Sequence, residues 1–364
     1  MARLTRAQTQ ERNRTRILAA ARDEFLRRGF RDATVDGIAE RAELTRGAVY
    51  SNFAGKRALY FAVLADDAAT AARAVLTPAA AAAEVGDAAD DPASTLGRIA
   101  RAWMARAPLA GDPPDAHARI GADLMTEVRA DDRLRTAYAQ LIEFEAIVVG
   151  LALESGAPAA GRRVRVARTA LTLLHGANQL AAAAPGFVEP FDVVRACERL
   201  AGLDDHDTWQ PAHLPHVPPA RPAHEHWAPP ARTDLLTGRP ARLEDDGVVA
   251  VLGVHRLGAI EEAVRAARAG CAVTAVVVTA APGELMPLTE LVVTEARGLL
   301  SHAVGPAARP ALRVVADPDG TVAAAAGVTV VDDATEAAVR VESHRVAARA
   351  VGRGAGHAAA TTVG

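Results

Sequence analysis

Two short helix patterns around a tight turn lie between Thr34 and Lys56, in the stretch TVDGIAERAELTRGAVYSNFAGK. Thr34 can cap the first helix, which we predict to run through Ala42 with one apolar face. Thr45 can cap the second helix, which we predict to end near Tyr50. This stretch therefore predicts a compact pair of helices followed by a positively charged side chain, that of Lys56.

A further helix precedes the pair, from about Gln8 to Arg28. Its apolar residues fall on one helical stripe, and Gly29 stands where a helix commonly ends in a left-handed residue. We therefore predict three helices within residues 8–50.

The charge of this region differs from that of the remaining chain. Residues 1–60 hold 13 Arg or Lys and 7 Asp or Glu, a net charge of +6, whereas the whole chain of 364 residues carries −3 and the remainder therefore −9. Of the 41 Lys and Arg residues, Lys56 is the single lysine. The N-terminal region alone has the electrostatics to bind phosphates.

The second helix of the pair has the features of a helix that enters the major groove of DNA. Gly47 and Ala48 are small enough to approach a groove about 12 Å wide. Arg46 can donate to a guanine edge or a phosphate, and Tyr50 and Asn52 can reach the sugar-phosphate chain.

Both capped helix N-termini, at Thr34 and Thr45, can also present free amides to phosphate. The residues alone leave an alternative, in which Arg41 and Arg46 are solvated charges and Tyr50 packs at a helix end.

The segment resembles the helix-turn-helix of the tetracycline-repressor (TetR) family, in a pattern formed here by Thr34, Thr45, Tyr50, Asn52, Phe53, Gly55 and Lys56. Over residues 10–65 the resemblance rests on this motif, and over residues 66–203 it rests on the pattern of predicted helices alone. It implies a DNA-binding transcriptional regulator, a homodimer on a palindromic double-stranded operator that releases DNA when a small molecule binds.

The resemblance also implies a set of DNA-binding positions, with a core role for Phe53: Thr34, Val35, Thr45, Arg46, Gly47, Ala48, Tyr50, Asn52, Phe53 and Lys56. One residue departs from the family pattern, because Glu43 stands in the turn where glycine is common. A left-handed conformation there would cost a non-glycine residue about 1 kcal/mol.

The chain stays helical in pattern up to residue 203. A helix begins at Lys56 and continues toward Leu76, and the later helices are predicted at Ser94 to Ala107, His117 to Arg129, Asp132 to Ser155, Gly161 to Ala184, and Pro190 to Leu203. We predict a DNA-binding domain over residues 8–66 and an all-helical effector-binding and dimerisation domain over residues 67–204.

The helix from Gly161 to Ala184 is apolar on so much of its surface that it needs partners on more than one side. With Pro190 to Leu203 it is the candidate dimer interface, and a central core helix of a monomer is the alternative. Apolar residues with a few polar anchors form the candidate effector pocket: Trp103, Met104, Met125, Phe144, His175 and Gln179.

Residues 205–232 change character, with seven prolines that stiffen a linker. Five histidines accompany them, at His206, His213, His216, His224 and His226. A metal site is the alternative to solvated linker histidines, but no cysteine accompanies them. We therefore expect neither a metal nor a cofactor.

Residues 233–364 alternate short β-branched runs with helical patterns, which predicts a small α/β domain. The predicted strands are Gly247 to Val254, Ala272 to Thr279, Leu312 to Ala316 and Val328 to Val331. The predicted helices are Ala259 to Ala269 and Leu288 to His302. The fold class is thus mainly α, with an α/β domain after a proline-rich linker.

The stretch LRVVADPDGTVAAAAGV resembles a segment of peroxiredoxins and other thioredoxin-fold proteins, and residues 337–352 resemble the hairpin that follows it. The region VLGVHRLGAIEEA, which corresponds to their thiolate site, lacks cysteine, so we predict a module without catalytic residues. The alternative is a thiol-dependent peroxidase or reductase that uses Cys271 and whose DNA-binding part autoregulates it. An interaction-only module is a third possibility.

The two cysteines, Cys197 and Cys271, form no CxxC pair, and no apolar stretch of signal-peptide length follows the basic start. We expect a cytoplasmic protein that does not bind a membrane.

Overall fold

The computed structural model describes residues 5–75, 91–106, 116–156, 161–203, 207–209, 211–305 and 309–362. The N-terminal helices are α1 (Arg6–Asp32), α2 (Val35–Arg41) and α3 (Arg46–Tyr50). Thr5 begins α1 with a capping box, in which its side chain accepts from the Gln8 amide while the Gln8 side chain accepts from the Thr5 amide. Gly29 has a φ of 71° and interrupts α1, as its left-handed preference predicts.

Seven helices are described after the N-terminal three and before the sheet: α4 (Lys56–Val75), α6 (Pro92–Met104), α7 (Ala116–Gly121), α8 (Leu124–Arg129), α9 (Asp132–Gly156), α10 (Val164–Ala183) and α11 (Pro190–Leu200). The single helix predicted over 117–129 is divided into α7 and α8. Asp123 lies at the break, and its carboxylate accepts a hydrogen bond from the amide of Phe30 at 2.9 Å. The break therefore serves to attach this segment to the end of α1.

Helix α9 is the one described helix that has the length and hydropathy of a membrane span. Within its apolar window, 61% of the residues are buried inside the protein, as expected of a core helix. Ala146, Ile147 and Val148 are completely buried.

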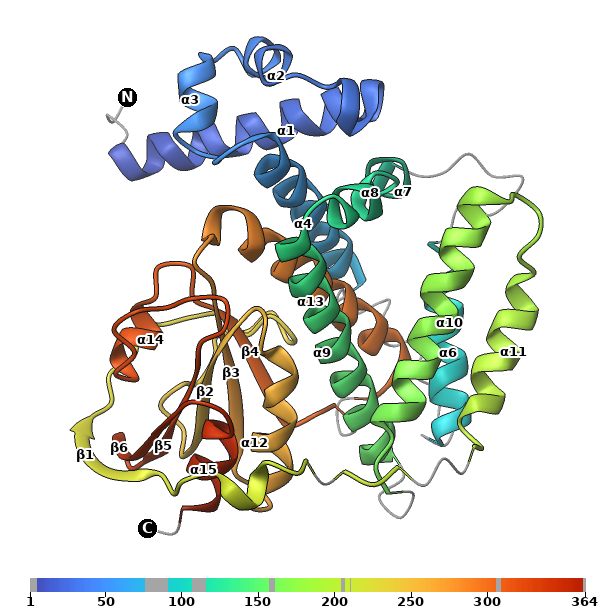
Figure 1. Cartoon of the computed structure of the whole chain (residues 1–364). Coiled ribbons are helices and arrows are strands. Elements are labelled where there is room, and N and C mark those ends of the chain that lie inside the picture. The colour runs from blue at the N-terminus through green and yellow to red at the C-terminus, as the bar shows by residue number, and fades with distance from the viewer. Residues whose placement is uncertain are drawn as a thin grey trace.

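A six-stranded mixed sheet occupies the C-terminal part, with strand order β1-β6-β5-β2-β3-β4 (Figure 1). The strands are β1 (Arg221–His226), β2 (Gly247–Gly253), β3 (Ala272–Val278), β4 (Leu312–Ala316), β5 (Glu336–Glu342) and β6 (Arg345–Val351). The pairs β2–β3 and β3–β4 are parallel, and β5 and β6 form an antiparallel hairpin beside β2. The helices of this part are α12 (Ile260–Ala266), α13 (Pro282–Ala303), α14 (Thr321–Ala325) and α15 (Ala355–Thr361), with 3₁₀ turns at Leu214–His216 and Leu257–Ala259.

Successive residues of β2 point to opposite faces of the sheet, which have separate cores. Val248 and Leu252 belong to a hydrophobic cluster shared with the helices, whereas Val249 and Val251 join a cluster that includes Trp227 and residues of α14. Burial on both faces explains why β2 is a continuous apolar run.

The segment predicted as a linker is partly built into this sheet. Residues Arg221–His226 form β1, which pairs with β6 as an edge strand, a position where Pro222 costs little. Trp227 is buried and its indole donates to the carbonyl of Leu243 at 2.8 Å. The α/β unit therefore begins at about residue 221 rather than 233.

A second difference concerns the end of the domain. Residues 328–331, predicted as a strand, are irregular, and the side chain of Val330 is 79% exposed. The strand that follows β4 along the chain is instead Glu336–Glu342, which pairs with β2 on the side opposite β3 and lies within the hairpin that the sequence resemblance located. A short β-branched run is a weak signal because it does not specify which sheet edge would pair with it.

Helix α13 connects β3 to β4, yet it packs chiefly against α4, α9 and α6 of the helical part (Figure 1). At its start, Glu284 pairs with Arg57 at the start of α4. At its end, Arg297 experiences the charge of Arg73, near the end of α4. The two helices therefore run side by side in the same direction, and the α/β unit supplies a helix to the helical core.

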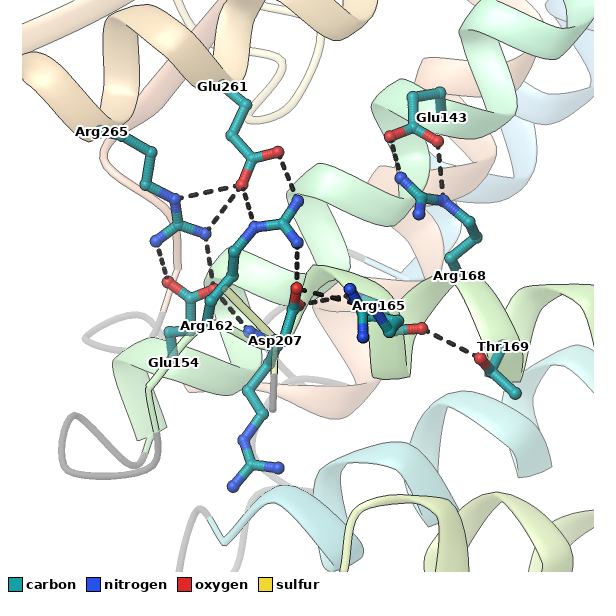
Figure 2. Close-up of polar contacts among 10 residues, drawn as sticks. Glu143, Glu154, Arg162, Arg165, Arg168, Thr169, Asp207, Glu261 and Arg265 are labelled. Carbon is teal, nitrogen blue, oxygen red and sulfur yellow. Dashed lines mark hydrogen bonds and ion pairs between the residues drawn. The ribbon is translucent and has the colours of Figure 1, made fainter. Parts of the chain in front are cut away.

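An ion-pair network joins the same two parts at another point, as Figure 2 shows. Glu261 of α12 accepts from Arg162, before α10, and from Arg265. Arg265 also donates to Glu154 of α9 at 2.5 Å, and Arg162 donates to the buried Asp207. Because the side chains of Glu261 and Asp207 lie almost entirely out of solvent, this network fixes the α/β unit against α9 and α10.

Candidate nucleic-acid interface

The two caps of the predicted helix pair are formed as the sequence indicates. The Thr34 hydroxyl oxygen accepts from the amide of Gly37 at 3.1 Å, and the Thr45 hydroxyl oxygen accepts from the amide of Ala48 at 3.2 Å. Both threonines are exposed. The N-termini of α2 and α3 therefore lie at the protein surface, where phosphate can reach them.

The turn between α2 and α3 contains a left-handed residue that is not glycine, a conformation that costs free energy. Glu43 has a φ of 51°, in the left-handed region where the pattern usually has glycine. Its carboxylate accepts from Arg16 of α1 at 2.8 Å, a contact that a glycine could not make.

Arg46 projects from the first turn of α3 and is exposed. It lies 3.3 Å from the carboxylate of Asp36 on α2, and its guanidinium carbon lies 5.5 Å from the centre of the Tyr50 ring. The Tyr50 side chain is 45% exposed, and Gly47 beside it is exposed as well. Arg46, Gly47 and Tyr50 thus share the accessible surface of α3. Asp36, the partner of Arg46, is also exposed.

Other predicted contact residues are partly engaged within the domain. Asn52 donates to the carbonyl of Ala48 at 2.8 Å, and both residues are half-buried. Val35 is half-buried against the core. Phe53 is buried with Arg14 stacked over its ring at 4.6 Å, so its position matches the implied core role and offers no surface to DNA.

The ammonium of Lys56, predicted to contact a DNA phosphate, is hydrogen-bonded within the domain. Its ammonium donates to the carbonyls of Phe30, Arg31 and Ala33 at 2.8, 3.1 and 3.1 Å, and it lies 4.5 Å from the centre of the Phe30 ring. A lysine has three donors, so a phosphate contact would have to replace one of these bonds. The arrangement joins the start of α4 to the end of α1, and the phosphate contact of Lys56 remains a prediction.

Arg41 has a partner within the domain, and sequence reasoning missed it. Glu24 of α1 is 1% exposed and pairs with Arg27, Arg28 and Arg41. The available signal was a carboxylate on the otherwise apolar inner face of α1. The pairing assigns Arg41 to joining α1 and α2.

The contact between Arg57 and Glu284 was also absent from the sequence analysis. Arg57 lies in the first turn of α4 and pairs with both Asp131, just before α9, and Glu284 of α13. Gly283 also lies close to Ala54: a Cβ added at Gly283 would be 3.3 Å from the Ala54 side chain. The α/β unit therefore touches the end of the helix-turn-helix segment.

The candidate effector residues fall into different environments. Trp103 and His175 meet edge to face, with ring centres 4.7 Å apart, and Glu145 of α9 lies 3.9 Å from the His175 Nε2. Burial raises the pKa of Glu145, and the nearby His175 opposes this effect in part. These three residues form a polar group among α6, α9 and α10, in which Glu145 is buried and Trp103 and His175 are half-buried. Sequence reasoning missed Glu145.

The other candidates do not join that group so clearly. Met104 and Phe144 are buried in the core, and Met125 is half-buried on α8. Gln179 is exposed on α10, so its side chain faces solvent rather than the interior. Helical periodicity alone did not separate the two faces of α10 at this position.

Among the described residues, the predicted linker histidines belong to no group of three or more potential metal ligands. His213 pairs with Glu262 at 2.8 Å, and His224 and His226 are exposed on β1. His206 lies outside the described residues.

Residues 17–63 match the family of bacterial regulatory proteins called the tetR family. These residues form a TetR-family DNA-binding domain. Over 65 residues the chain is 51% identical to the HTH-type transcriptional regulator SrpR of Pseudomonas putida and equally to the uncharacterized HTH-type transcriptional regulator TtgW, also of P. putida. That segment is 18% of this chain and spans 30% and 48%, respectively, of these relatives.

Solved structures align over a longer part of the chain at low similarity. A candidate TetR-family transcriptional regulator from Mesorhizobium loti aligns with 55% of this chain and 96% of its own, with a TM-score of 0.38 and 14% identity. RolR in complex with resorcinol aligns with 54% of this chain and 90% of its own, with a TM-score of 0.31 and 20% identity. The match over residues 17–63, and not these structures, identifies the N-terminal domain as a DNA-binding helix-turn-helix of a transcriptional regulator.

Proposed function

We propose that this chain is a cytoplasmic homodimeric repressor that binds a palindromic operator and releases it when a small molecule binds. The observation that carries the proposal is the exposed surface made by the capped N-termini of α2 and α3 with Arg46, Gly47 and Tyr50. In a dimer, two such surfaces reach successive major grooves when they lie about 34 Å apart.

The exposed apolar residues of α10, α11 and the segment between them support a dimer. Phe187 and Phe191 are 74% and 79% exposed, and Leu180 of α10 is also exposed. Large apolar side chains gathered at one surface mark an interaction site more often than they mark free surface. A second copy of the same two helices would cover them.

The DNA-binding proposal is tested by selecting bound fragments from genomic DNA and measuring affinity for the selected operator by fluorescence anisotropy. Arg46→Ala should weaken operator binding by roughly 1–3 kcal/mol, which is about 5- to 150-fold, because a base contact is lost. Arg135→Ala, which removes an exposed arginine on α9, is the control. Equal affinities of Arg46→Ala and the unchanged protein would contradict the role of α3.

The dimer is tested by sedimentation of Phe191→Glu, which should be monomeric. Val330→Glu introduces the same charge at an equally exposed position outside the proposed interface and should leave the dimer intact. Two variants of the same mass would refute this interface.

For the effector, the partly buried group of Trp103, Glu145 and His175 supports a site between α6, α9 and α10. A thermal-shift screen of small molecules, repeated with Trp103→Ala, tests it. A ligand that stabilises both proteins equally binds elsewhere.

The alternative is a thiol-dependent enzyme that uses Cys271. One contact favours it, because the guanidinium of Arg340 donates to the Cys271 Sγ at 3.3 Å, and reactive cysteines commonly lie beside a cation. Cys271 precedes β3, however, and the end of β2 that corresponds to the thiolate site carries Val254 and His255. Peroxide consumption that is lost in Cys271→Ser would establish this enzyme, and an inactive unchanged protein would exclude it.

A further inference from the structure

A small pocket lies where the end of α13 meets the sheet. It contains about 300 Å³ of empty space, including the solvent at its mouth. Its lining comes from the turn before β2, from the last turns of α13 and from the start of β4: Leu236, Thr237, Arg297, Leu300, Ser301, Arg309, Pro310 and Leu312. Two arginines therefore share an otherwise mainly apolar pocket.

Arg297 is 9% exposed, yet its Nε has no hydrogen-bond partner in the described part of the chain. Its guanidinium lies against Gly238, where an added Cβ would be 2.5 Å from Nη1. Gly238 also has a φ of 70°, a conformation that strains a residue with a side chain, and the guanidinium would have to shift to admit one. The backbone is thus shaped to admit this side chain.

Asp234 is a nearby acid whose charge acts on Arg297, but its oxygens serve other groups. They accept from the amides of Leu236 and Val314 at 3.1 and 3.0 Å and from the Thr237 hydroxyl at 2.6 Å. Burial, together with the charge of Arg73, lowers the pKa of Arg297. The fold therefore buries this cation without giving it a carboxylate of its own.

The second arginine is half-buried. The buried Nε of Arg309 has no partner among the described residues. The hydroxyls of the pocket are already used, since Thr237 donates to Asp234 and Ser301 donates to the carbonyl of Arg297 at 2.7 Å. The donors that remain for a ligand are those of the two guanidinium groups.

Buried polar groups are nearly always hydrogen-bonded, and an arginine without an acceptor is expensive to keep. Guanidinium groups match carboxylates in shape and charge, and Leu236, Leu300 and Leu312 can cover a small apolar body. We propose that Arg297 and Arg309 form a binding site for a small organic carboxylate with a short apolar or aromatic body. This site goes beyond the proposed function, because it belongs to the α/β unit and does not depend on operator binding.

The test measures binding of benzoate to the full-length protein by calorimetry, beside benzamide, its neutral counterpart, and inorganic phosphate. We expect benzoate to bind and the other two to bind at least tenfold more weakly. Arg297→Met and Arg309→Met should each weaken benzoate binding by about 10- to 100-fold, because each removes a charged hydrogen-bond donor. Arg239→Met, at an exposed arginine of the same turn, removes the same charge and should change nothing.

A second measurement separates a ligand site from a structural arginine. Without ligand, Arg297→Met should melt at a temperature equal to or above that of the unchanged protein, since it removes an unpaired buried charge while filling a similar volume. Three results would overturn the proposal: equal binding of benzoate and benzamide, preference for phosphate over benzoate, or benzoate binding that both methionine variants retain.

Discussion

Replacing Leu288 with alanine tests whether α13 is part of the helical core. Leu288 is completely buried on α13, in the hydrophobic cluster that also contains Leu59 and Leu64 of α4. Leu→Ala substitutions in such cores cost about 2–5 kcal/mol, through lost burial and the cavity left behind. With total stabilities of roughly 5–15 kcal/mol, the loss should be plain in urea unfolding.

The tryptophans allow the effect to be followed in each part. Trp103 lies on α6 in the helical part, and Trp227 is buried against the sheet. Variants that keep one of them, with the others changed to phenylalanine, report each part separately. If α13 joins the two parts, both signals should show one shared transition that Leu288→Ala moves to lower urea concentration.

Separate transitions, with Leu288→Ala shifting the Trp227 signal and leaving the Trp103 signal unchanged, would refute this reasoning. Val330→Ala is the control, since that side chain is largely exposed and its loss should change stability by about 0.5 kcal/mol at most. The same logic predicts that a chain ending at residue 232 unfolds more readily than the full protein.

Three further predictions concern charged groups. Lys56→Met should lower the melting temperature and weaken binding to all DNA sequences alike, because the three carbonyls at the end of α1 lose their donor; an unchanged melting curve would contradict this. Glu261→Gln should cost about 3 kcal/mol in urea unfolding by leaving buried arginines short of charge, whereas Glu225→Gln, at an exposed pair, should have little effect. Burial raises the folded-state pKa of Glu145 above its ordinary value of 4.5, so its stabilising contribution is present below pH 4.5 and is lost as the pH rises through the folded-state pKa; Glu145→Gln should flatten that part of the stability profile, and identical profiles would exclude the effect.

Local signals predicted the N-terminal domain well. The caps at Thr34 and Thr45 and the left-handed Gly29 each depend on a few neighbouring residues, and each occurs as expected. Glu43 adopts the left-handed conformation of the turn despite the cost to a non-glycine residue. The order of the helices up to residue 200 followed from 3.6-residue periodicity, apart from the break at Asp123.

Long-range features were beyond the same reasoning. The carbonyls that hold Lys56 are supplied by another helix, and β1 depends on β6, more than a hundred residues later. The helical pattern over 288–302 located part of α13. Periodicity does not predict whether such an apolar helix packs against the sheet or against the helical part. Contacts between segments that are far apart along the chain depend on tertiary packing, so they could not be predicted from this one sequence.

The position of α13 beside α4 has a consequence for synthesis in the cell. Helix α4 ends at Val75 and α13 ends at Ala303, 228 residues later along the chain. At about 5–20 residues per second, a ribosome needs on the order of 10 to 45 s to cover that interval. During this time the growing polypeptide exposes the apolar surface of α4 that α13 will later cover. The protein should therefore depend on chaperone protection while it is being translated, and products of premature termination within this interval should aggregate.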